Sequence, residues 1–124
     1  MKLNSYFKSI IDSDRQAVVI CDLNHIIIYM NPAAVNRYSK RGGNKLVGKS
    51  LLDCHNKQSC DMIEKIIAWF KSDEQNNCIY TFHNDKENAD VYMIALRDDS
   101  KQLIGYYEKH ESRIVETMSM YDFK

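Results

Sequence analysis

The residue types best suited to chemistry gather in one short stretch, where Cys54 and His55 are followed by Cys60. A neutral imidazole can bind a metal ion, and a thiolate can bind zinc or react if a helix N-terminus lowers its pKa. Zinc sites usually need four ligands in close pairs, and a second pair is missing here. The simpler interpretation is that His55 caps or hydrogen-bonds the start of the next helix and that Cys54 is an inert thiol.

Other patterns of catalytic sites are absent from the sequence. No Ser/His/Asp set or close carboxylate pair stands out, and Gly42-Gly43-Asn44-Lys45 lacks the spacing of a phosphate-binding loop. We therefore expect no enzymatic activity, with a small enzyme kept as an alternative. The cysteines form no CxxC pair or dense disulfide pattern, which predicts reduced thiols in the cytoplasm. They are Cys21, Cys54, Cys60 and Cys78.

The composition narrows the class of protein further. The chain has 124 residues, which suits one domain, and its 17 Lys+Arg residues balance 17 Asp+Glu residues. A balanced charge argues against a general nucleic-acid binder, which needs excess cations. No run of 18 apolar residues is present to span a membrane, and the start MKLNSYFKS lacks the apolar region of a secretory signal.

Helical periodicity begins at the N-terminus. The residues Leu3, Tyr6, Phe7 and Ile10 share one face of a helix predicted within the flanking segment 1–12. This apolar stripe must be covered, either by the rest of the domain or by a second copy of the chain.

The remaining pattern predicts an α+β domain with a five-stranded antiparallel sheet, covered on one face by short helices and one longer helix. The long helix is expected at 58–71 and a short one at 33–39, after Asn31 as cap and Pro32. The segment 114–124 is expected to be a tail or a short helix. The strands are expected at 17–21, 26–30, 78–83, 91–97 and 103–110.

Four stretches in this order make residues 13–113 resemble the PAS domain family of sensory modules. The resemblance implies a cavity between the concave face of the sheet and the short helices, used in the family for haem, flavin, small ligands or nothing visible. It also implies dimerisation through the N-terminal helix, with Leu3, Tyr6, Phe7 and Ile10 as the interface. The stretches are Val18–Asp22, Ile27–Ala34, Val47–Leu52 and Arg97–Gly105.

The resemblance also implies candidate cavity residues. His55 lies near the position of the proximal histidine of PAS haem proteins, although that ligand usually lies on the long helix itself. A flavin photoadduct is not expected, because Leu52-Asp53-Cys54-His55-Asn56-Lys57 lacks the Asn-Cys-Arg-Phe-Leu signature. By analogy with the last hairpin of the family, Gly105 and Tyr107 should share the cavity face with Met93 and Ala95. The cofactor-binding candidates are His55, Met62, Ile66, Met93, Ala95 and Tyr107, with His55 as the metal ligand.

The function expected from these features is that of a stand-alone cytoplasmic PAS module. It would bind a small ligand or cofactor, possible haem included, and signal through a homodimer or a partner kinase or regulator. Because the PAS body takes up most of the length, we expect no attached output domain. The alternative is a ligand-free PAS module for protein–protein interaction and dimerisation.

Overall fold

The computed structural model describes residues 3–123. Met1, Lys2 and Lys124, at the ends of the predicted segments 1–12 and 114–124, lie outside the described residues. The first half of the chain contains α1 (Leu3–Ser13), β1 (Val19–Asp22), β2 (Ile27–Met30), α2 (Pro32–Arg37) and the 3-10 turns η1 (Ser39–Arg41), η2 (Gly43–Leu46) and η3 (Leu51–Cys54). The second half contains α3 (Lys57–Ser72), β3 (Cys78–Asn84), β4 (Ala89–Arg97) and β5 (Leu103–Ser112).

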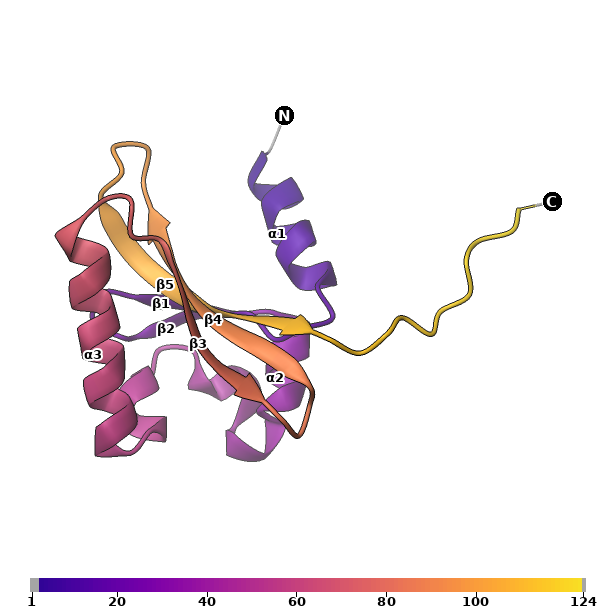
Figure 1. Cartoon of the computed structure of the whole chain (residues 1–124), viewed down its shortest axis with the longest axis horizontal. Helices are drawn as coiled ribbons and strands as arrows, with labels where there is room; N and C mark the ends of the chain where they lie inside the picture. Colours follow the sequence, from indigo (N-terminus) through magenta and orange to yellow (C-terminus); the bar gives the residue numbers. More distant parts are fainter. Residues whose placement is uncertain (1–2, 124) are drawn as a thin grey trace.

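The five strands form one antiparallel sheet in the order β2-β1-β5-β4-β3. The helix α3 and the short helices lie on one side of this sheet, and α1 stands on the other side (Figure 1). Strand β5 lies in the centre and passes very close to β1, because an added Cβ at Gly105 would lie 2.2 Å from the carbonyl oxygen of Cys21. The predicted α+β class is confirmed.

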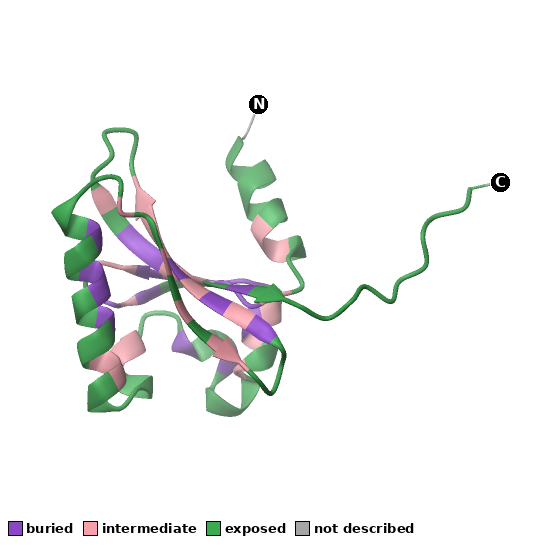
Figure 2. Cartoon of the chain, viewed as in Figure 1, coloured by how far each residue is buried: buried purple, intermediate pink, exposed green. Residues whose placement is uncertain are grey.

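The hydrophobic core lies between α3 and the sheet, as the purple residues of Figure 2 show. Helix α3 begins after Asn56, whose side chain accepts a hydrogen bond from the Ser59 amide, and it turns one apolar stripe inward. The segment after η2 runs beside β2, where the Gly48 amide donates to Ile27 at 2.8 Å. This segment closes the side of the domain between β2 and α3. The buried residues of α3 are Ile63, Ile66, Ile67 and Phe70.

The last two strands are longer than the sequence predicts, and the tail is not helical. Ala89 pairs with Ser112, so the β4–β5 ladder extends two residues beyond the predicted ends at Val91 and His110. After Ser112 the chain leaves the body without a regular element (Figure 1). Of the two expected forms of 114–124, the described part is a tail. Its apolar side chains have no surface to pack on, and so short a helix is marginal by itself.

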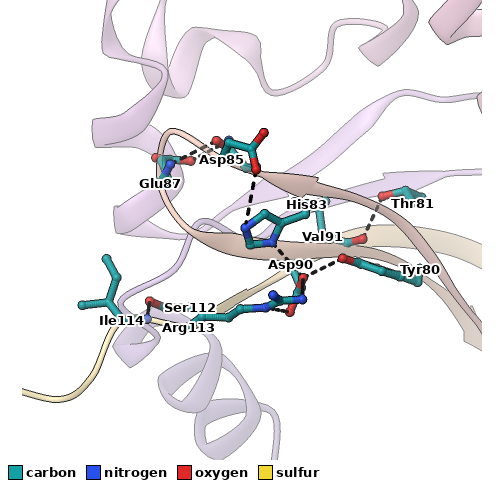
Figure 3. A network of polar contacts seen from close by, with 11 residues as sticks. Tyr80, Thr81, His83, Asp85, Glu87, Asp90, Val91, Ser112, Arg113 and Ile114 are labelled. Carbon is teal, nitrogen blue, oxygen red and sulfur yellow. Dashed lines mark hydrogen bonds and ion pairs between the residues drawn. The ribbon is translucent and has the colours of Figure 1, made fainter.

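A polar cluster fixes the end of the sheet from which the tail leaves (Figure 3). The carboxylate of Asp90 on β4 accepts hydrogen bonds from Tyr80 at 2.7 Å and from the Arg113 guanidinium at 2.7 and 2.8 Å. His83 Nδ1 lies 2.9 Å from the same carboxylate. The Arg113 guanidinium, followed by Tyr80 and His83, holds the pKa of Asp90 well below its usual range. The cluster therefore joins β3, β4 and the first tail residue through one ionised side chain.

Asn31 connects the N-terminal segment with the sheet and with α2. Its side-chain oxygen accepts hydrogen bonds from the backbone amides of Val18 and Ala34, both at 2.9 Å. Its side-chain nitrogen donates to the carbonyls of Ile11 at 2.9 Å and Gln16 at 3.0 Å. Asn31 is fully buried, so these backbone groups have no access to water through it. One side chain thus satisfies the end of α1, the entry to β1 and the start of α2.

We expect Asn31→Ala to lower the free energy of unfolding by about 3 kcal/mol or more, because it removes a helix cap worth about 1 kcal/mol and leaves buried backbone groups unpaired. Asn56→Ala is the matched control, since Asn56 caps α3 through one exposed hydrogen bond and should cost only about 1 kcal/mol. Urea unfolding followed by circular dichroism measures both values. Equal losses in the two variants would show that Asn31 is no more than a helix cap.

Candidate functional site

A cavity of about 220 Å³ lies between the concave face of the sheet and the helices. Most of its wall is apolar, which excludes water from a bound molecule. A cavity of about 150 Å³ can hold one benzene ring, whereas drug-sized ligands occupy pockets of about 300 Å³ or more. The space therefore suits a molecule of one ring or two small fused rings. The apolar wall consists of Ala17, Val19, Ile27, Met30, Leu46, Leu51, Ile63 and Met93.

Four polar side chains of the wall, Tyr38, Arg41, Glu108 and His110, form a polar end of the cavity. Burial raises the pKa of Tyr38, and the charges of Glu108 and Arg41 act on the same phenol group, so these side chains are close together. His110 Nε2 lies 3.1 Å from a carboxylate oxygen of Glu108. Within residues 3–123, Nδ1 of His110 is the only buried side-chain nitrogen or oxygen without a hydrogen-bond partner.

A second polar group leads from the cavity wall to the surface of α3. Tyr106 lines the cavity, and its hydroxyl lies 2.8 Å from Nδ1 of the buried His25. The other ring nitrogen of His25 lies 2.9 Å from a carboxylate oxygen of Glu64, which is 58% exposed. Burial raises the pKa of Tyr106 and that of Cys21, its hydrogen-bonded neighbour on the wall, the latter to about 11. Both groups stay protonated at neutral pH and can only donate or accept hydrogen bonds there.

The sequence analysis missed His25, because Asp22-Leu23-Asn24-His25 predicts only a turn. In the structure His25 takes a positive φ of 65° at this turn, a conformation in which histidine is enriched. Its carbonyl accepts a hydrogen bond from the Leu51 amide at 2.7 Å. A histidine in a tight turn is a weak signal by itself, and Glu64 comes near it only through packing of α3.

The structure brings two of the predicted site residues, His55 and Met93, to the cavity wall. The His55 side chain is exposed, and its Nδ1 donates a hydrogen bond to the Leu51 carbonyl at 2.9 Å. Since a carbonyl only accepts, the proton lies on Nδ1, and a neutral His55 keeps a lone pair on Nε2. Helix α3 is capped by Asn56 and not by His55.

The structure places the other four predicted residues outside the wall. Tyr107 is a correction: Ala95 pairs with Tyr106 in the β4–β5 register, so Tyr106 shares the inner face and Tyr107 lies on the outer face. Ala95 itself packs against the core beside the cavity. On α3, Met62 is 53% exposed and Ile66 is buried in the core, whereas Ile63 lines the cavity.

The cysteines make no metal centre within residues 3–123, where no three His, Cys, Asp or Glu side chains are grouped to hold an ion. All four thiols are free, and Cys60 Sγ contacts the Leu52 carbonyl at 3.4 Å. In the same part of the chain, no helix combines the length and the apolar character needed to cross a membrane.

We expect Tyr106→Phe to lower the free energy of unfolding by about 1–3 kcal/mol, because the variant leaves Nδ1 of His25 buried without a partner. Tyr107→Phe is the matched control on the outer face and should change it by less than about 0.5 kcal/mol. Urea unfolding of the two variants gives the difference. If Tyr107→Phe were the more harmful change, the inner hydroxyl would not stabilise the turn.

Comparisons with known proteins agree on one fold. Among solved structures, the PAS domain of a protein from Colwellia psychrerythraea matches with a TM-score of 0.65 and 12% identity, covering 90% of this chain and 97% of that one. The PAS domain of BvgS from Bordetella pertussis matches with a TM-score of 0.64 and 13% identity, covering 94% and 90%. The Aer2 receptor from Vibrio cholerae, a dual PAS-heme oxygen sensor, gives a TM-score of 0.56 and 18% identity, covering 79% and 94%.

No curated protein matches the sequence. The family model described as "PAS domain" matches residues 7–110, which includes α1 from Phe7 onward and the whole sheet as far as His110. This match covers most of the chain and agrees with the sheet order and the covered inner face. The chain belongs to the PAS domain family.

Proposed function

We propose that this chain is a cytoplasmic sensory module that binds a small ligand in its cavity and signals through a homodimer or a partner kinase or regulator. The observation that carries the proposal is the 220 Å³ cavity, whose apolar wall ends at a buried histidine nitrogen without a partner. A domain that served only for packing would gain stability by filling this space with side chains. The free cysteines suit a reducing compartment.

Two features of the cavity could transmit occupancy to the surface. Tyr106 connects the wall with His25, which contacts the exposed Glu64 on α3. At the polar end, Glu108 is half-exposed and contacts the buried His110. A ligand that changes either pair would favour one arrangement of the surface over another. Signalling needs such a difference in affinity, because a ligand that binds both arrangements equally shifts nothing.

Helix α1 supports the homodimer. Each apolar residue of its stripe is more than half exposed, from 51% for Leu3 to 68% for Ile10. The helix is held only near its end, where Asp12 accepts a hydrogen bond from Tyr29 and the Ile11 carbonyl accepts one from Asn31. A second copy offers an identical stripe, and pairing of the two would bury both. An apolar groove beside Ile10, against the outer face of the sheet, continues this surface.

We expect Ile10→Glu to convert the dimer to monomers, because it places two buried charges in the proposed interface while leaving the monomer core untouched. Ser9→Glu is the matched control, since it adds the same charge beside the stripe and should leave the dimer intact. Sedimentation velocity at several concentrations measures both. A monomeric wild-type protein, or a dimer that survives Ile10→Glu, would refute this interface.

Haem is the second candidate ligand, favoured by one contact. The hydrogen bond from His55 Nδ1 to Leu51 leaves Nε2 available, which is the usual arrangement of a metal-binding histidine. The size of the cavity argues against it, because a macrocycle of four pyrrole rings needs far more than 220 Å³. Haem would therefore require η3 and α3 to move away from the sheet. When bound, it would supply an iron that binds small gases.

Native mass spectrometry and an absorption spectrum of the purified chain test these candidates together. We expect a dimer mass with a retained small molecule and no Soret band, because the cavity is ring-sized. A Soret band that disappears in His55→Ala and persists in His83→Ala would establish haem instead. A protein that carries no added mass and gains none from a mixture of ring-sized metabolites would refute ligand binding and favour the ligand-free interaction module.

A further inference from the structure

The buried nitrogen of His110 identifies the part of a ligand that the cavity would recognise. Residues Tyr106, Glu108 and His110 alternate along β5 on its inner face, and all three line the cavity. His110 is 9% exposed, so bulk water does not reach its ring freely. Buried polar atoms in native proteins are nearly always hydrogen-bonded. The missing partner of Nδ1 is therefore expected from a molecule in the cavity.

The neighbour of His110 decides which kind of partner fits. Its Nε2 lies 3.1 Å from a carboxylate oxygen of Glu108, and an ionised carboxylate can only accept a hydrogen bond. The proton of the neutral imidazole therefore lies on Nε2, and Nδ1 carries a lone pair. A partner for Nδ1 must donate a hydrogen, as a hydroxyl or an N–H group does.

The charges and the shape of the cavity narrow the ligand further. Arg41 and Glu108 are the charged side chains of Asp, Glu, Lys or Arg type on its wall, and their charges are opposite. The wall therefore has no excess charge to compensate that of an anion or a cation. Elsewhere the wall is apolar, with the adaptable side chains of Met30 and Met93. A neutral ring suits this wall, and its one polar group suits the polar end.

We propose that the cavity binds a neutral compound of one ring or two fused rings, whose hydroxyl or N–H group donates a hydrogen bond to Nδ1 of His110. Phenol and indole are the simplest members of this class. The hydroxyl of Tyr38 and the guanidinium of Arg41, at the same end, can donate to the oxygen of a bound hydroxyl group. This inference rests on the proposed ligand-binding function and specifies the ligand of the same cavity.

Titrations of the full chain with phenol and with toluene, followed by amide shifts in nitrogen-15 NMR spectra, test the proposal. The two probes have nearly the same shape, and only phenol donates a hydrogen bond. We expect phenol to bind about tenfold more tightly, although toluene is the more apolar molecule. The shifted amides should belong to residues of the wall. Benzoate, which carries a negative charge and no donor, should bind more weakly than phenol.

A matched pair of variants assigns the preference to one histidine. His110→Phe removes the acceptor but keeps a ring of similar size, and it should abolish or reverse the preference for phenol. His55→Phe changes another histidine of the wall and should retain the preference. His110→Leu serves the same purpose as His110→Phe if the latter does not fold. The wild-type comparison of the two probes does not depend on any variant.

Several results would overturn the proposed ligand class. These are equal or tighter binding of toluene, tighter binding of benzoate, a preference for phenol that survives both His110 variants, or no wall shift with any probe. The proposed function fails separately. If toluene and phenol bind the wall equally, the cavity is a ligand site and only the role of His110 falls. If the native mass shows no small molecule and no probe binds, the ligand-binding function falls as well.

Discussion

The hydrogen bonds of the Asn31 side chain are the constraint on which the arrangement of this domain depends. The sheet begins at β1 and β2, and both strands must be placed before α2 can turn back under them. Asn31 is fully buried and accepts from Val18 and Ala34 while it donates to Ile11 and Gln16. A buried amide can satisfy donors and acceptors together, which neither an aspartate nor an aliphatic side chain can do. The floor of the cavity and the base of α1 are therefore fixed by one residue.

The cavity has two polar exits that differ in their hydrogen bonding. On one side, Tyr106, His25 and Glu64 form a continuous connection from the wall to the surface of α3. On the other side, the pair of Glu108 and His110 stops at a nitrogen without a partner. A complete network gives rigidity, whereas an incomplete one marks a place for a further molecule. This contrast is the physical basis for placing the ligand's polar group at His110 and a route to the surface at His25.

The apolar surface of the chain lies outside the domain body, at its two ends. The stripe of α1 and the tail after Arg113 expose their large side chains, while the sheet and α3 enclose a conventional core (Figure 2). The two ends are joined by an ion pair between Arg15 and Glu116 at 2.7 Å. The Asp90 cluster holds Arg113 just before the tail begins. Contacts to other chains are therefore expected at these ends, on the side of the sheet away from the cavity.

The sequence by itself determined the order of the elements, the α+β class and the family, because hydrophobic periodicity and capping residues act over short distances. It placed Asn31, Pro32 and the stripe of α3 correctly and brought His55 and Met93 to the region of the cavity. It failed at Tyr107, since strand side chains alternate and a register judged one residue out moves every side chain to the other face. The partners of His25 and the unpaired nitrogen of His110 were decided only by tertiary structure, because they depend on packing between segments far apart in the chain.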